Sequence, residues 1–205
     1  MATRVLQTAL GKVPQLGFDR ALLASVRESG LSDSALALFP KGSFDLVKFH
    51  LQTAKQDLEK VQLESAGTGN WHSDSISTLL EHRLRANNRL GEGRLQEALS
   101  IMTMPANLVD SLSELHDLSD EVLYLSGERT SDFSWYTKRG AVSSIYAASE
   151  LFMTQDQSTE FRDTMEFMKD RVKNYDQLEY AGSSVGEWLK FNSMGAFNVL
   201  KSLTR

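Results

Sequence analysis

The sequence predicts an all-α protein, and three observations lead to this fold class. Apolar residues recur at helical spacing in several segments, only three prolines interrupt the 205 residues, and no strand-like run bounded by turn residues appears. Apolar residues make up 41% of the chain and charged residues 24%, which is the ordinary balance of a globular protein with a sizeable core. At this length we expect one domain or two tightly joined subdomains.

Residues 1–50 are expected to form an N-terminal subdomain of short helices with sharp breaks. Pro14 and Gly17 end the first helix, and Gly30 ends the second. A third short helix is predicted within 32–39, before a long helix that begins near Ser43. The inward residues predicted for that long helix are Leu46, Val47, Phe49 or His50, Leu51, Ala54 and Leu58. Two helices, a tight turn, a short helix and a long helix are the outline of a helix-turn-helix module.

This outline is similar to the start of tetracycline-repressor-type regulators, whose three-helix head precedes a helical ligand-binding domain. The expected recognition helix, within 32–39, contains no Lys or Arg, and the net charge of the chain is −5. DNA binding draws most of its affinity from cationic contacts to phosphate. We therefore keep the fold analogy and predict no nucleic-acid partner.

Residues 51–180 are expected to form the helical ligand-binding domain. The Gly- and Ser-rich stretch after residue 62 predicts a connector, because its GxG follows no strand and is a weak nucleotide-binding signal. Further helices are predicted at Ser75–Leu90, Arg94–Met104, Val109–Ser126 and Asp132–Thr154, with another capped by Ser158. The buried side of that last helix is predicted to be Phe161, Met165, Met168, Val172 and Tyr175.

The residues for common catalytic and metal chemistry are missing from the sequence. There is no cysteine, no GxSxG or phosphate-binding loop motif, and no Glu-x-x-His of the kind that a helical di-iron site uses twice. We expect no metal, no cofactor and no enzymatic activity. No run of apolar residues is long enough to span a bilayer. Gly11 and Lys12 interrupt the apolar residues near the N-terminus, which argues against a secretory signal.

Three segments carry candidate binding surfaces. The first, DFSWYTKR at 132–139, sets Trp135 beside Tyr136 between charged residues, which is the composition of a protein-docking hot spot. Neighbouring helical residues point about 100° apart, so at least one of the two rings should face outward. The alternative is a core Trp beside a half-buried Tyr at the start of a helix.

The second segment, 95–125, is rich in Leu and Met, which suits a pocket for a long apolar chain but also an ordinary core. The third, 181–205, predicts an amphipathic C-terminal helix. Its apolar face carries Trp188 and its opposite side carries lysines, as in helices that lie in a membrane interface. The alternatives for this helix are packing on the core or on a dimer partner.

The segments ALSIMTMP, DFSWYTKR and IYAASELFMTQD resemble the lipid-binding auxiliary proteins of ubiquinone biosynthesis that assist the demethoxyubiquinone hydroxylase. The resemblance implies lipid-binding residues Met102, Met104, Pro105, Leu108, Tyr146, Met194 and Phe197. It implies hydroxylase-binding residues Asp120, Asp132, Trp135, Tyr136 and Arg139. It implies membrane-binding residues Val185, Trp188, Leu189, Lys190, Leu200 and Lys201.

From this resemblance we expect a homodimeric accessory protein that binds an isoprenoid lipid or ubiquinone precursor and presents it to the hydroxylase within the ubiquinone-synthesis complex. The expected location is the matrix side of the mitochondrial inner membrane, as a peripheral protein, with a transit peptide either removed from this chain or not included in it. Two other functions stay open: a lipid-responsive transcription regulator of the tetracycline-repressor type, and a structural scaffold of a membrane enzyme complex.

Overall fold

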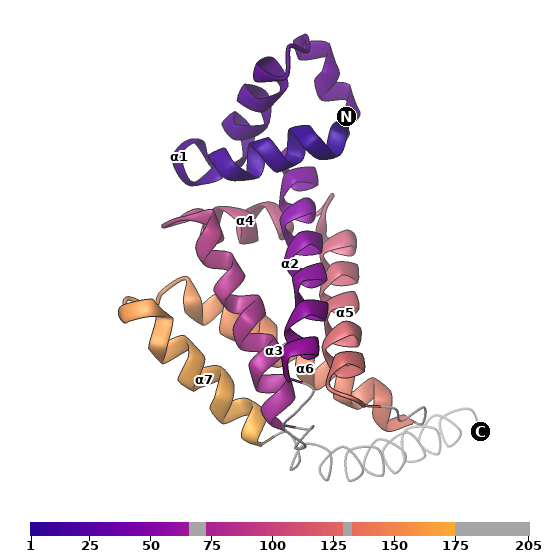
Figure 1. Cartoon of the computed structure of the whole chain (residues 1–205), viewed down its shortest axis with the longest axis vertical. Helices are drawn as coiled ribbons and strands as arrows, with labels where there is room; N and C mark the ends of the chain where they lie inside the picture. Colours follow the sequence, from indigo (N-terminus) through magenta and orange to yellow (C-terminus); the bar gives the residue numbers. More distant parts are fainter. Residues whose placement is uncertain (66–72, 129–132, 175–205) are drawn as a thin grey trace, which may run out of the picture.

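The computed structural model describes residues 1–65, 73–128 and 133–174, and within these ranges the chain is helical and contains no strand (Figure 1), which confirms the predicted fold class. The elements are α1 (Ala2–Glu28), η1 (Asp33–Leu38), α2 (Ser43–Ser65), α3 (Ser73–Ala86), η2 (Asn87–Leu90), α4 (Arg94–Met102), α5 (Leu108–Leu125), α6 (Phe133–Met153), η3 (Thr159–Phe161) and α7 (Arg162–Lys173).

The N-terminal elements form a head above the other helices, and α2 runs from this head down beside α5 (Figure 1). The helix α1 bends at Gly17, whose φ of 75° is outside the helical region, so the predicted break between two helical segments is confirmed. The segment expected to be a third α-helix is instead the 3-10 helix η1. None of its six residues is fully buried, so little packing energy is available to hold a full α-helix there.

Two hydrophobic clusters make up the core. The N-terminal cluster joins α1 to the start of α2, and it is completed by Leu90, Ala98 and Ile101 from η2 and α4. The larger cluster joins the far end of α2 to α3, α5, α6 and α7. Of the residues predicted to face inward on α2, Leu46, Val47, Ala54 and Leu58 are buried, and between Phe49 and His50 the buried one is His50.

Polar side chains cap the start of α7. The backbone N–H of Asp163 donates to Ser158 Oγ at 3.0 Å, which supports the cap predicted at Ser158. Asp156 adds a second cap, since one of its carboxylate oxygens accepts from the Thr164 N–H at 2.8 Å and the other accepts from the Ser158 N–H at 2.7 Å. The residues Met165, Met168 and Val172 are buried as predicted, whereas Tyr175 lies outside the described residues.

Candidate functional site

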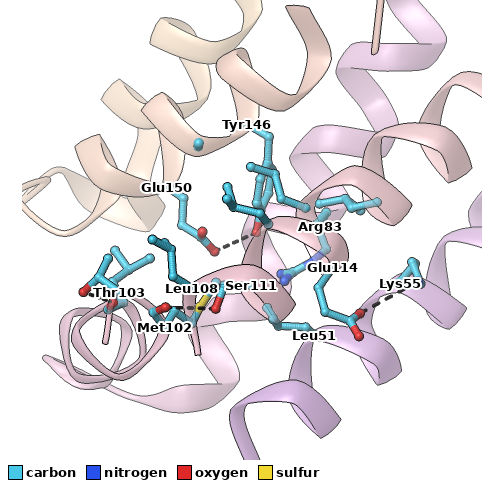
Figure 2. A pocket seen from close by; sticks show the side chains of 15 residues that line it. Leu51, Lys55, Arg83, Met102, Thr103, Leu108, Ser111, Glu114, Tyr146 and Glu150 are labelled. Carbon is cyan, nitrogen blue, oxygen red and sulfur yellow. Dashed lines mark hydrogen bonds and ion pairs between the residues drawn. The ribbon is translucent and has the colours of Figure 1, made fainter. Parts of the chain in front are cut away.

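A cavity of about 170 Å³ lies between α2, α4, α5 and α6, with one side chain from α3 (Figure 2). Its wall is mainly apolar and consists of Leu51, Leu99, Met102, Leu108, Leu112, Leu115, Leu118 and Ala147. Polar groups contribute at a few positions, and these are Lys55, Arg83, Thr103, Ser111, Glu114, Tyr146 and Glu150. A concave apolar wall with a few polar groups is the usual form of a small-molecule site.

The turn between α4 and α5 forms one side of this cavity. It is held by side chains that satisfy the last carbonyls of α4: Asn107 Nδ2 donates to the Ile101 carbonyl at 2.9 Å, and Ser111 Oγ donates to the Met102 carbonyl at 3.0 Å. These bonds close a sharp turn and direct α5 across the end of α4. As a result Met102 and Leu108, which flank the turn, both face the cavity.

The structure separates the predicted lipid-binding residues into three groups. Met102, Leu108 and Tyr146 line the cavity. Met104 and Pro105 do not line it, and the Met104 side chain is 51% exposed on the outer side of the turn. Met194 and Phe197 lie outside the described residues, as do the predicted membrane-binding residues Val185, Trp188, Leu189, Lys190, Leu200 and Lys201.

A buried hydrogen-bond network stands at one end of the cavity, and its key member was not predicted from the sequence. Arg83 donates from a terminal nitrogen to Asn87 Oδ1 at 2.9 Å, and Asn87 Nδ2 donates to Glu150 Oε1 at 3.0 Å. The Tyr146 hydroxyl donates to the same Glu150 oxygen at 2.7 Å. Arg83 shares the buried face of α3 with Ile76, Leu79 and Leu80, and an arginine in such an apolar row was the signal available in the sequence.

The protonation states in this network follow from its burial. Burial, together with the positive charge of Arg83, lowers the pKa of His50 to about 4, so this ring is neutral at physiological pH. Its Nε2 lies 3.1 Å from Asn87 Oδ1, which is an acceptor, so Nε2 carries the proton. Burial also raises the pKa of Tyr146 well above its usual value, so its hydroxyl is a donor. Of His50, Tyr146 and Arg83, the side chain that carries a positive charge is therefore Arg83.

Apolar side chains next to the cavity are also exposed on the surface. Leu108 and Leu112 line the cavity and remain 44% and 53% exposed, and Val109 between them is 78% exposed. With Met104, these residues make up what we call the mouth patch. Contiguous apolar side chains of this kind on a surface indicate contact with a lipid, a membrane or another protein.

A second surface forms where α5 meets the start of α6, and we call it the aromatic patch: Asp120, Trp135, Tyr136 and Arg139. The guanidinium of Arg139 lies 4.9 Å from the centroid of the Trp135 ring, and that ring meets Tyr136 edge to face at 4.9 Å. Tyr136 is 66% exposed, so the expectation that one ring faces outward is confirmed. Asp132 lies outside the described residues.

Lys138 does not belong to the charged rim that the sequence indicated. Its side chain is 5% exposed and its Nζ lies 2.8 Å from a carboxylate oxygen of Glu128. Lys138 is thus a buried ion-pair partner and not a surface charge, because the helix turns it away from Tyr136 and toward the end of α5.

No group of His, Asp or Glu suited to a metal ion occurs among the described residues. No helix in the described part of the chain has the length and apolar character needed to cross a bilayer.

Comparison with known proteins gives a consistent set of matches. The COQ9 family model matches residues 108–179. The protein named "Ubiquinone biosynthesis protein coq9, mitochondrial" of Schizosaccharomyces pombe is 37% identical over 199 residues, which cover 97% of this chain and 79% of that protein. The corresponding proteins of Eremothecium gossypii and Saccharomyces cerevisiae are 34% and 33% identical, and the matches cover 86% and 82% of their lengths.

Proposed function

This chain belongs to the COQ9 family, and we propose that it is a non-catalytic lipid-binding protein of ubiquinone biosynthesis that takes up a polyprenylated quinone intermediate at a membrane and presents it to the demethoxyubiquinone hydroxylase. Relatives that are named as mitochondrial ubiquinone biosynthesis proteins support the pathway and the organelle. We further propose that it acts as a peripheral protein on the matrix side of the inner membrane.

The apolar cavity is the observation that carries this proposal. Each CH₂ of a prenyl chain costs about 0.8 kcal/mol to expose to water, so a carrier needs an apolar site. The cavity of about 170 Å³ exceeds an engineered apolar cavity of about 150 Å³ that binds benzene in another protein. It therefore has room for one ring or a short length of tail, and the rest of a long ligand would continue over the mouth patch.

The aromatic patch supports the part of the proposal that concerns a protein partner. An exposed Tyr beside a half-buried Trp that is covered by an arginine has the composition of an interface hot spot. The aromatic patch and the mouth patch are separate surfaces. Trp135 and Arg139 lie near the start of α6, whereas the mouth patch lies at the turn before α5 and at the start of that helix. One protein could thus hold a ligand and an enzyme at once. The identity of the enzyme rests on the family resemblance.

The rival function, a lipid-responsive transcription regulator, has little support in the head. Arg27, which contacts η1, donates to both carboxylate oxygens of Asp33 at 2.9 and 2.8 Å, and η1 itself contains no cation. A recognition element without cationic side chains gains little binding affinity from contacts to the phosphates of DNA. Salt-dependent binding to duplex DNA would favour this rival.

Native mass spectrometry of the purified protein tests the proposal. After expression in a host that makes isoprenoid quinones, the protein should carry bound lipid, with quinone intermediates enriched over their share of the membrane lipid. Protein that is free of lipid and does not take up added prenylated quinone would contradict lipid binding. Lipid bound without any enrichment of quinones would contradict the ligand class.

A further inference from the structure

Arg83 is a buried cation with one side-chain hydrogen-bond partner in the described part of the chain. The residue is 1% exposed, it lines the cavity, and Figure 2 shows its side chain reaching in between Tyr146 and Glu114. Within the described ranges, its guanidinium donates a hydrogen bond to Asn87 and forms no ion pair. A guanidinium carries five N–H donors, so the bond to Asn87 uses a minority of them. A buried charge is normally both paired and hydrogen-bonded, so the other donors suit an acceptor that enters the cavity.

The guanidinium of Arg83 lies over the ring of Tyr146, so a ligand is expected to meet it at its N–H groups. Its central carbon lies 5.3 Å from the centroid of the Tyr146 ring, at cation–π distance. The Tyr146 hydroxyl donates to Glu150, so it does not compete for a ligand that approaches the N–H groups of Arg83. The N–H donors lie in the plane of the guanidinium, and they are the donors available to a ligand in the cavity.

The charge balance of the cavity selects the kind of acceptor. The carboxylate of Glu150 is linked to Arg83 through Asn87 and already offsets its positive charge. A second carboxylate, Glu114, lines the same cavity, with Lys48 and Lys55 as its ion-pair partners at 3.4 and 3.9 Å. The charges that line the cavity thus balance, with Arg83 and Lys55 against Glu114 and Glu150. An anionic ligand would leave the site with a net negative charge, whereas a neutral oxygen would keep the balance.

We propose that Arg83 is a head-group subsite, in which N–H groups of its guanidinium that face the cavity bind a neutral ring oxygen of a prenylated quinone or phenol. The ring then enters the cavity first, and the tail leaves past Leu108 and Leu112 over the mouth patch. The cavity volume fits one six-membered ring. This inference rests on the proposed function, because it names the part of the ligand that the same cavity recognises.

Isothermal titration calorimetry with three probes of matched chain length tests the subsite. The probes are a benzoquinone with a short prenyl tail, the prenyl hydrocarbon without the ring, and a fatty acid. Wild-type protein should bind the quinone at least about tenfold tighter than the hydrocarbon. Arg83→Met should weaken quinone binding roughly ten- to a hundredfold, as expected for a hydrogen bond to a charged group, and should leave hydrocarbon binding unchanged.

Arg85→Met is the matched control, since Arg85 lies on the same helix, pairs with Glu81 and has a side chain that is 43% exposed. It should not change the affinity for any probe. If Arg83→Met does not fold, the ranking of the three probes on wild-type protein decides the question. Equal affinities for quinone and hydrocarbon would overturn the subsite while leaving lipid binding intact.

Two other outcomes separate the subsite from the function on which it rests. Wild-type protein that binds none of the three probes would overturn the proposed function itself. Tightest binding of the fatty acid, lost on Arg83→Met, would show that Arg83 reads a carboxylate and would overturn the neutral ring oxygen.

Discussion

The guanidinium of Arg139 on α6 lies 2.5 Å from the carboxylate of Asp120 on α5, and this ion pair fixes the start of α6 against α5. The pair is only partly solvated. Burial raises the pKa of Asp120, even though Arg139 acts in the opposite direction. Among the described residues, one oxygen of Asp120 and Nε of Arg139 are buried and have no hydrogen-bond partner. The pair therefore acts as a partly buried support for the Trp135 ring, and its atoms without partners lie below the surface that a docked protein would contact.

Substitutions in the aromatic patch should weaken binding of the hydroxylase. Trp135→Lys and Tyr136→Ala each remove an aromatic anchor, and hot-spot residues of this kind contribute about 2–4 kcal/mol. We expect roughly thirty- to a thousandfold weaker binding and accumulation of the demethoxy precursor. Co-purification and quinone profiling are the measurements. Leu151→Ala, at the far end of the same helix and 64% exposed, is the control. Unchanged capture of the enzyme by both variants would place the docking site elsewhere.

Filling the cavity should displace lipid without unfolding the protein. Met102 lines the cavity, so Met102→Trp should occupy much of its volume and lower the lipid occupancy seen by native mass spectrometry. Met104 is 51% exposed and lies outside the wall, so Met104→Trp is the matched control and should retain lipid. Circular dichroism should show the same helicity for both. Equal occupancy in the two variants would mean that lipid binds at another place.

The buried His50 should make stability depend on pH. The pKa of His50 is about 4 in the folded protein and about 6.5 in an unfolded chain, so the neutral ring favours folding. The contribution is complete above pH 6.5 and is lost as the pH falls toward 4, by up to about 3 kcal/mol. The free energy of unfolding, measured with urea at several pH values in this range, should depend less on pH for His50→Gln than for wild type. The same substitution at the exposed His116 should leave the profile unchanged, and a His50→Gln profile as steep as wild type would contradict the assignment.

Two glycines of α1 should respond in opposite ways to alanine. Gly17 has a φ of 75°, and a Cβ there would lie 2.9 Å from a terminal nitrogen of Arg94. Gly17→Ala should therefore destabilise the protein by about 1–3 kcal/mol. Gly11 lies within the helix with open space around it, so Gly11→Ala should stabilise by roughly 0.5–1 kcal/mol. Thermal unfolding gives the melting temperature of each variant. Shifts of the same sign for Gly17→Ala and Gly11→Ala would contradict this prediction.

The C-terminal segment should bind membranes. Deleting the residues after Gly182 should leave a folded protein that no longer floats with anionic liposomes, and Trp188→Glu should have much the same effect because a charge opposes insertion of an apolar face. Flotation and circular dichroism are the measurements. A truncated protein that unfolds, or that loses a dimeric state, would favour packing of this segment on the core or on a second copy.

Features of the fold that depend on near neighbours can be predicted from the sequence alone. The helical class, the break at Gly17, the buried row Met165, Met168 and Val172, and the cap at Ser158 all follow from spacing and backbone preferences within a few residues. The aromatic pair at Trp135 and Tyr136 was visible for the same reason, because two adjacent rings on a helix diverge whatever lies around them.

The contacts between side chains of different helices could not be predicted from the sequence and depend on how the helices pack. Met102 and Met104 lie in the same Leu- and Met-rich segment, and the sequence does not distinguish their roles. The turn held by Asn107 and Ser111 directs Met102 into the cavity and leaves Met104 exposed to solvent. The network of Arg83 with Glu150 joins residues from α3 and α6 through Asn87. Local periodicity predicts that a face is buried, but it carries no information on the distant helix that covers that face. The shape and the polar end of the cavity therefore depend on long-range packing.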